Sequence, residues 1–203
     1  MKAYHIDRFG SIGGIVRRSA EDPRPGPKEV LVRVRASSLN YRDLMVLKGG
    51  GRGPTKLGVI PLSDGAGDIE AVGEGVTRVK VGDRIAGCFH PRWYGGPIKP
   101  DYLTDRLGAN LDGMLAEYAV LNEEALVHVP SHLSFEEAAT LPCAAVTAWV
   151  AVTRDKDTAT SANQKITSPG AKSIVFYQLP VVCPDFKVSA TIGDHAWPVT
   201  AAK

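Results

Sequence analysis

Hydrophobic and polar residues alternate along much of the chain, in short segments separated by glycine and proline. The clearest alternation lies in residues 29–36, where Val30, Val32 and Val34 occupy every second position. This period of two predicts a strand with one buried face. Similar segments predict further strands at residues 2–6, 14–19, 68–72, 84–88, 114–121 and 125–129, the first two of them paired with each other. Short strands at this spacing favour a small barrel or sandwich over a parallel sheet.

Three segments predict helices. Residues 40–48 form a short one, with Leu44 and Leu47 on one side. Ser134 and Glu137 have the spacing of a capping box, and Pro142 ends or kinks the helix that this box begins. Residues 143–152 are apolar on nearly all sides, which predicts a third helix, a buried one, there.

The pattern changes after residue 152. Residues 153–170 are rich in threonine, serine, lysine and aspartate, a composition typical of loops or disorder. Residues 173–183 favour a strand, but Pro180 interrupts it. We therefore predict one domain at residues 1–152 and a divergent, loop-rich or partly disordered tail at residues 153–203. The predicted fold class is mainly β with a few helices, followed by an irregular tail.

Composition narrows the possible functions. The 203 residues carry a formal net charge of +2 without a basic run, so there is no electrostatic case for a nucleic-acid partner. The longest apolar run, residues 143–152, is far shorter than the roughly 20 residues that span a bilayer. The first residues lack the apolar stretch of a signal peptide, and three widely spaced cysteines do not make a disulfide framework. We expect a soluble, cytoplasmic protein without a nucleic-acid or membrane partner.

Polar side chains gather in residues 38–43, where the predicted strand ends and the first predicted helix begins. Such a junction can line a cleft. On local physics, helix capping is the favoured interpretation, with Ser38 or Asn40 as the N-cap and Asp43 near the positive end of the helix.

Gly65 and Gly67 resemble a phosphate-binding loop only superficially. A dinucleotide fingerprint needs a third glycine and a following helix, but Glu70 stands at that position and a strand follows. The glycines are better explained by a bend or bulge in a barrel strand.

A metal site has weak support. Cys88 and His90 are two residues apart, but no second pair lies at ligand spacing, and a structural zinc site needs four ligands. We therefore predict no metal. Thr147 also has a structural interpretation, because its hydroxyl can bond back to the carbonyl of Cys143, one helical turn earlier.

Six segments, taken together and in order, resemble the medium-chain dehydrogenase/reductase superfamily, in its zinc-lacking, quinone-oxidoreductase-like branch. The resemblance covers residues 1 to about 152, and it implies a GroES-like, partly open β-barrel as the catalytic domain of an alcohol dehydrogenase-like oxidoreductase. The matching segments are residues 25–35, 38–44, 61–67, 79–84, 112–118 and 133–142.

The resemblance also implies a zinc-independent site. Zinc-dependent relatives have a cysteine near position 40 and a Gly-His-Glu triplet near position 64, whereas this chain has Asn40 and Ser63-Asp64-Gly65. Neutral asparagine and serine cannot replace thiolate and imidazole as zinc ligands. The implied cofactor is NADP or NAD, and the implied substrate is a small carbonyl compound, enone or quinone.

Four residues receive roles by this resemblance alone. Asn40 and Asp43 would lie beside the nicotinamide ribose and amide, and Thr147 would contact the carboxamide. Tyr41 would sit at the substrate cleft, as a possible proton donor. Asn40 and Tyr41 are thus the catalytic candidates, and Asn40, Asp43 and Thr147 are the cofactor-binding candidates.

The chain departs from the family after residue 152. Only 51 residues remain, whereas a doubly wound nucleotide-binding domain needs on the order of 120. We expect that domain to be absent, which would leave the chain weakly active or inactive alone. Two alternatives stay open: a non-catalytic binding or structural module, perhaps pairing with a full-length relative, and a complete reductase with an unconventional cofactor site in the tail.

Overall fold

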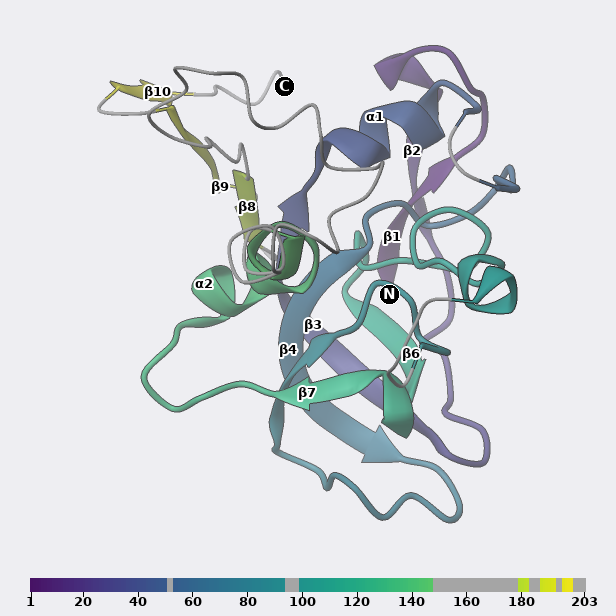
Figure 1. Ribbon diagram of the computed structural model, residues 1–203, viewed down its shortest axis with the longest axis vertical. Helices are drawn as coiled ribbons and strands as arrows, with labels where there is room; N and C mark the ends of the chain where they lie inside the picture. The colour runs from purple at the N-terminus through teal and green to yellow at the C-terminus, as the bar shows by residue number, and fades with distance from the viewer. Residues whose placement is uncertain (51–52, 94–98, 148–178, 183–186, 193–194, 199–203) are drawn as a thin grey trace, which may run out of the picture.

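The computed structural model describes residues 1–50, 53–93, 99–147, 179–182, 187–192 and 195–198. Within these ranges, antiparallel strands form one two-stranded and one eight-stranded sheet, with short helical segments at the strand ends (Figure 1). The predicted mainly β fold class is thereby confirmed. Among the described residues, no helix has the length and apolarity needed to cross a membrane.

The central strand is β3 (Glu29–Leu39), which pairs with three others. One edge pairs with β4 (Asp64–Val72), and β5 (Arg84–Gly87) and β7 (Leu126–His128) continue the sheet from there. The other edge pairs with β6 (Tyr118–Asn122) along its first half and with β8 (Leu179–Val182) along its second half.

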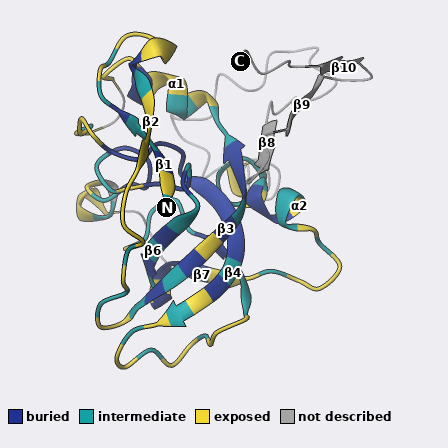
Figure 2. Cartoon of the chain, turned by 180° about the vertical axis from the view of Figure 1, so that it is seen from behind, coloured by how far each residue is buried: buried dark blue, intermediate teal, exposed yellow. Residues whose placement is uncertain are grey.

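The main core lies on the face of β3 that the alternating valines form. Val30, Val32 and Val34 are buried, whereas Arg33 between them is exposed, so the predicted period of two is confirmed (Figure 2). Each fully buried side chain of this size contributes about 1.5–3 kcal/mol. The core cluster comprises Val30, Val32, Val34, Ile69, Ile85, Leu107, Met114, Ala119, Leu121 and Leu126.

The strands β3 and β4 bend at a bulge. Val34 faces Gly67 and Ala36 faces Ala66, which leaves Arg35 as the extra residue on β3. A side chain at Gly67 would place its Cβ only 2.1 Å from the carbonyl oxygen of Arg33. The predicted bend or bulge at this glycine is thus present as a bulge between β3 and β4.

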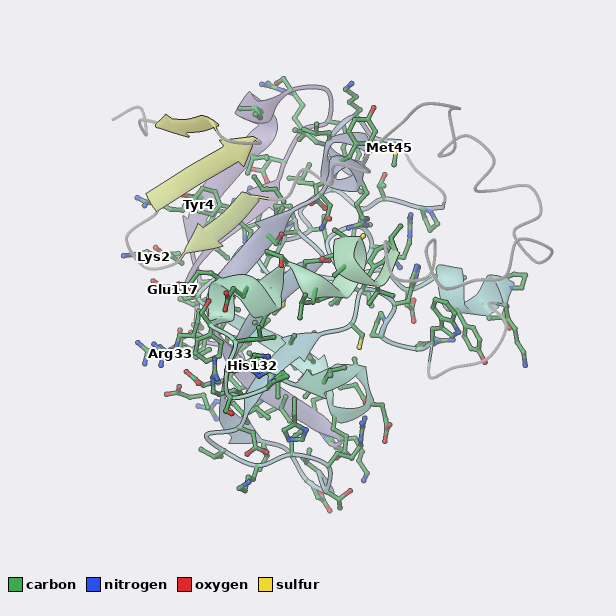
Figure 3. The ribbon with its side chains drawn as sticks, turned by 60° about the vertical axis from the view of Figure 1, so that its left-hand side comes forward. Lys2, Tyr4, Arg33, Met45, Glu117 and His132 are labelled. Carbon is green, nitrogen blue, oxygen red and sulfur yellow. The ribbon has the colours of Figure 1, made fainter. Side chains whose placement is uncertain are left out.

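A separate hairpin forms the N-terminal part. β1 (Lys2–Ile6) pairs antiparallel with β2 (Ile15–Ser19), as predicted, across a short turn η1 (Ile12–Gly14). Glu117 joins the hairpin to the barrel, because its Oε2 accepts from Lys2 N at 2.7 Å and its own N donates to Lys2 O at 3.0 Å. Figure 3 shows Lys2 and Glu117 on the same side of the molecule.

The first two predicted helices are present. α1 (Tyr41–Leu47) buries Val46 and Leu47, whereas Leu44, expected on the same side as Leu47, is 48% exposed. α2 (Phe135–Ala139) begins with the predicted capping box: Ser134 N donates to Glu137 Oε2 at 2.8 Å, and Glu137 N donates to Ser134 Oγ at 3.2 Å. Two further turns are η2 (Pro100–Leu103) and η3 (Glu123–Ala125).

The third predicted helix differs from the expectation. It begins at Leu141 as the π-helical turn η4 (Leu141–Ala145), and none of its residues is buried. Val146, which follows, is 54% exposed. The prediction of a buried helix is therefore wrong over residues 143–147, and residues 148–152 lie outside the described ranges.

In the C-terminal segment, β8 is followed by β9 (Lys187–Ile192) and β10 (His195–Pro198), and the three strands pair antiparallel. β8 joins β3 through the register pairs Ala36–Val182 to Leu39–Leu179 (Figure 1). The strand includes Pro180, at which the β-prone segment was expected to break. The predicted domain boundary at residue 152 and most of the predicted tail lie outside the described residues.

Candidate functional site

Three segments that are distant in sequence meet at one end of the barrel: the start of α1, the start of β4 and the first turn of η4. Asp64 opens β4 and lies opposite Ser38 of β3, two residues before the N-cap of α1. The Oδ2 atom of Asp64 accepts a hydrogen bond of 2.8 Å from the backbone N of Cys143 in η4. This contact brings the predicted residues at positions 40–43 near the helix that carries Thr147.

The start of α1 is a capped helix N-terminus. Asn40 is the N-cap, and its backbone N donates to Asp43 Oδ2 at 2.8 Å. The capping interpretation of residues 38–43 is thus confirmed, with Asn40 rather than Ser38 at the cap. The buried Asn40 side chain lies beside Asp64, and its hydrogen bond lowers the pKa of that carboxyl group.

Arg42 is a largely buried cation, with its side chain 11% exposed. Its Nη1 donates to Asp43 Oδ1 at 3.2 Å and to the Leu107 carbonyl at 3.1 Å, and its guanidinium lies 4.3 Å from the ring centroid of Phe89. Burial lowers the pKa of Arg42, while the charges of Asp43, Cys143 and Asp64 oppose this change. Arginine keeps its proton in proteins, so it remains the positive charge of the site.

Two carboxyl groups share this cation. Burial raises the pKa of Asp43 from 3.8 to about 6, against the opposing effect of Arg42. Burial also raises the pKa of Asp64, against hydrogen bonds from Ser63, Cys143 and Asn40. Ser63 Oγ donates to Asp64 Oδ1 at 2.6 Å, so both oxygens of this buried side chain have partners.

Thr147 and Cys143 are linked through the helix backbone. The Thr147 hydroxyl donates to the Cys143 carbonyl at 2.7 Å, which confirms the predicted back-bond. Because its one proton is used, this exposed hydroxyl offers only lone pairs to a ligand. Burial, with a further contribution from Asp64, raises the pKa of the Cys143 thiol to about 11, so the thiol is protonated at neutral pH.

A cavity of about 630 Å³ opens beside η4. It lies between η4, α2, β7 and the segment that follows β5, and its lining is mainly apolar. Volumes of this size suit a small organic ligand. The lining residues are Ala86, Gly87, Cys88, Phe89, His90, Trp93, Val127, His128, Val129, Pro130, Ala138, Leu141, Pro142, Cys143, Val146 and Thr147.

The donors present fit zinc poorly. Among the described residues, no three histidine, cysteine, aspartate or glutamate side chains are grouped as metal ligands would be. Cys88 and His90, the pair noted in the sequence, both line the cavity, where burial raises the pKa of the thiol and lowers that of the imidazole. The carboxyl groups of Asp43 and Asp64 already have the guanidinium of Arg42 as their counter-charge. We derive no step that depends on a metal ion.

The four predicted residues lie around this site in different environments. Asn40 and Asp43 belong to the buried cap, with both oxygens of Asp43 bonded within the protein. Tyr41 is 74% exposed on α1, and Thr147 is on the cavity wall. Their roles toward a cofactor or substrate stay predictions.

Sequence reasoning missed the buried partners Arg42, Asp64 and Cys143 as site residues. One signal was present: Asp64 closely follows the apolar residues 59–62, and an aspartate in apolar surroundings is rarely buried unless it is paired. The pairing itself joins residues 79 positions apart, and no local pattern encodes that separation.

Comparison with known proteins places this geometry in a family. Residues 26–131 match the alcohol dehydrogenase GroES-like domain. A zinc-type alcohol dehydrogenase-like protein of Schizosaccharomyces pombe is 52% identical over 124 residues, covering 61% of this chain and 36% of that protein. A quinone oxidoreductase of Pseudomonas aeruginosa is 40% identical over 138 residues, covering 65% of this chain and 35% of that protein.

Solved structures of alcohol dehydrogenases are also similar to this chain. A thermostable alcohol dehydrogenase from Pyrobaculum aerophilum superposes with a TM-score of 0.64 at 34% identity, covering 77% of this chain and 48% of that one. The chain thus spans less than half the length of these relatives. The matched domain and the relatives together show that the chain belongs to the medium-chain dehydrogenase/reductase family, through its alcohol dehydrogenase GroES-like domain.

Proposed function

We propose that the chain provides the substrate-side domain of a zinc-independent, NADP- or NAD-dependent oxidoreductase that acts on a small apolar carbonyl compound, enone or quinone. The observation that carries the proposal is the apolar cavity beside η4, with the Thr147 hydroxyl and the Cys143 thiol on its wall. Apolar walls with a few polar groups are typical of small-molecule sites, because the walls exclude water and the polar groups orient the ligand. The names of relatives, such as quinone oxidoreductase, support the substrate class.

The residues at the site suit a nicotinamide ring. Reduced nicotinamide, when bound, supplies the hydride of such reactions. The lone pairs of the Thr147 hydroxyl suit the N–H donors of a carboxamide. Asn40, at the N-cap of α1 and with its side chain beside Asp64, would lie next to the ribose and amide of the nicotinamide. Asp43 would act indirectly, by holding the Asn40 backbone, since both of its oxygens are bonded within the protein. The exposed phenol of Tyr41 is the candidate that would donate a proton to the product.

We further propose that this chain alone binds the dinucleotide weakly. Pyrophosphate is ordinarily held at a glycine-rich turn between a parallel strand and a helix. The described C-terminal strands β8, β9 and β10 pair antiparallel, and this arrangement supports the expectation of weak binding.

Binding of a fully substituted quinone tests the substrate side. Duroquinone, which is fully substituted and resists addition of thiols, should quench the fluorescence of the purified chain in a saturable way through Trp93, which lines the cavity. Trp93→Phe should remove most of that quenching, and Val146→Asp, which places a charge on the cavity wall, should weaken binding at least about tenfold. Absence of saturable quenching would overturn the substrate-side assignment.

A titration with NADPH and with NADH, followed by nucleotide fluorescence, tests the cofactor side. We expect dissociation constants in the millimolar range or weaker, and Thr147→Val should weaken what binding remains. Micromolar binding would contradict the proposed weakness and favour a complete reductase. After dialysis with zinc and then against buffer, the chain should hold far less than one equivalent of the metal.

A non-catalytic binding module is the second candidate. Exposed apolar side chains on α1 and around η4 favour it, because a partner could cover them. They include Tyr41, Leu44, Leu141 and Val146. This candidate would be supported over the first by two results together. The chain would form a complex with a co-expressed full-length relative, which Val146→Asp abolishes, and the chain would not bind duroquinone.

A further inference from the structure

Asp64 is a buried carboxylate whose two oxygens are bonded by different segments. Oδ1 accepts from the hydroxyl of the adjacent Ser63 at 2.6 Å, and Oδ2 accepts from Cys143 N at 2.8 Å, across 79 positions of sequence. Aspartate is rarely fully buried unless it is paired, because burial of an unpaired charge is costly. Its place at the site therefore needs a reason beyond packing.

The bond to Cys143 satisfies the start of a helix. The first N–H groups of any helical segment have no partner within it, and a negative charge near them is favourable. Cys143 is the third residue of η4, and its N–H finds its acceptor in β4 rather than in its own helix. The cap residue Thr140 makes no such side-chain bond, so Asp64 acts as the capping group from outside the helix.

On the other side, Asp64 faces α1. The Asn40 amide and the Arg42 guanidinium both lower the pKa of Asp64, and Asp64 in turn raises the pKa of Asp43 and of the Cys143 thiol. The charge of Asp64 therefore affects groups on both α1 and η4, the two segments that carry the proposed cofactor contacts.

We propose that Asp64 is a positioning residue: by holding the first turn of η4 at the start of β4, beside the N-cap of α1, it sets Thr147 and Cys143 in place relative to Asn40. The position of Thr147 depends on Asp64 through Cys143: Asp64 accepts a hydrogen bond from Cys143 N, and the Thr147 hydroxyl donates to the Cys143 carbonyl. The consequence for catalysis rests on the proposed function, but the inference can be tested without cofactor or substrate.

Two substitutions separate charge from hydrogen bonding. Asp64→Asn keeps an oxygen that can accept from Cys143 N but has no charge, whereas Asp64→Ala loses both. Asp68→Asn is the matched control, because Asp68 lies on the same strand but forms a half-exposed ion pair with Arg35 at 2.6 Å. Each folded variant is compared with the unaltered chain by amide exchange of Cys143 and by alkylation of its thiol from pH 7 to 11, measured on peptides by mass spectrometry.

We expect amide exchange of Cys143 to be at least about tenfold faster in Asp64→Ala, since a hydrogen bond to a carboxylate is worth more than a factor of ten. The increase should be smaller in Asp64→Asn, which keeps a neutral oxygen that can accept from Cys143 N. In Asp64→Asn, alkylation of Cys143 at pH 9 should be about three- to tenfold faster, because a charge that opposes thiolate formation is gone. Cys88, whose pKa responds to burial and Arg78 rather than to Asp64, should react as before.

An unchanged alkylation profile of Cys143 in Asp64→Asn overturns the proposal, and so do equal effects in Asp68→Asn. If Asp64→Ala fails to fold, the alkylation profile of Asp64→Asn decides alone. Failure of duroquinone or nucleotide binding would contradict the proposed function and leave this result standing.

Discussion

Arg78 donates two hydrogen bonds to Glu123, one from its backbone and one from its side chain. The Glu123 carboxylate accepts from Arg78 N at 2.8 Å, and Arg78 Nη1 donates to the Glu123 carbonyl at 3.1 Å. The same carboxylate also accepts from Thr77 N at 2.7 Å and from Lys28 Nζ at 3.0 Å. These bonds attach the connection between β4 and β5 to η3, which explains why a glutamate is buried at this end of the barrel.

Replacing this carboxylate should lower stability in a pH-dependent way. The bonds from Arg78 and Thr77 lower the pKa of Glu123 from 4.5 to about 2, so its contribution is fully present above pH 4.5 and is lost as pH falls toward 2. Glu123→Gln should therefore unfold at a lower temperature than the unaltered chain at pH 7, and the difference should shrink between pH 4.5 and 2. Thermal unfolding followed by circular dichroism at several pH values measures it. Glu124→Gln, which alters a half-exposed pair with Arg78, should change the melting temperature little.

The contribution of Asp43 to stability should depend on pH in the opposite direction to that of Glu123. Its pKa is raised from 3.8 to about 6, so the folded state favours the protonated carboxyl, and this contribution is lost as pH rises from 3.8 through 6. Asp43→Asn cannot ionise, and its stability relative to the unaltered chain should improve by up to about 3 kcal/mol between pH 4 and 7. Urea unfolding at four pH values measures the difference. An Asp43 carboxyl resonance that titrates near pH 4 by nuclear magnetic resonance would contradict the expectation.

The bulge between β3 and β4 should tolerate no side chain at Gly67. An added Cβ would lie 2.1 Å from the Arg33 carbonyl oxygen, which is backbone and cannot rotate away. We expect Gly67→Ala to lose about 3 kcal/mol or more of the free energy of unfolding, or to be insoluble on expression. Gly13→Ala is the control, because the nearest atom to its Cβ, Ser11 Oγ, is at an ordinary 3.8 Å. Equal stability of the two variants would show that the strands can separate at the bulge.

Two methionines give a matched pair for the core. Met114 is fully buried in the main cluster, whereas Met45 is 40% exposed on α1. Figure 3 labels Met45. Met114→Ala should cost about 2–5 kcal/mol, because a cavity remains where the side chain was, and Met45→Ala should cost less than about 1 kcal/mol. Urea unfolding of both variants checks the contrast, and a small effect of Met114→Ala would indicate that the barrel collapses around the gap.

Local sequence patterns predicted most strands of the barrel but placed the ends of several strands incorrectly. The valine alternation in β3 was sufficient to identify the strand, yet the strand continues to Leu39 through Ser37 and Ser38, whose polarity ends the pattern. Ser37 can be buried there because its Oγ donates to the Met114 carbonyl at 2.6 Å. Such a partner, 77 positions away, has no signature in the sequence around residue 37.

The site was predicted only where its residues are neighbours in sequence. Asn40 and Asp43 were both expected at the start of one helix, and there the Asn40 backbone N donates to Asp43. Asp64 and Cys143 meet only because the strands and helices around them pack as they do, and the exposure of Val146 depends on which surfaces the fold leaves uncovered. Charge and hydrophobicity along the chain do not carry that information.

The three-way pairing of β3 has a consequence during synthesis. Its partners in β4 lie about 35 residues farther along the chain, those in β6 about 90 and those in β8 about 145. At a translation rate of about 5–20 residues per second, β3 leaves the ribosome roughly 5–20 seconds before β6 can reach it. For that interval its valine face and one set of backbone donors and acceptors are open to other chains. We therefore expect the nascent chain to depend on a chaperone that binds extended segments. It should aggregate when translation stalls between residues 40 and 118.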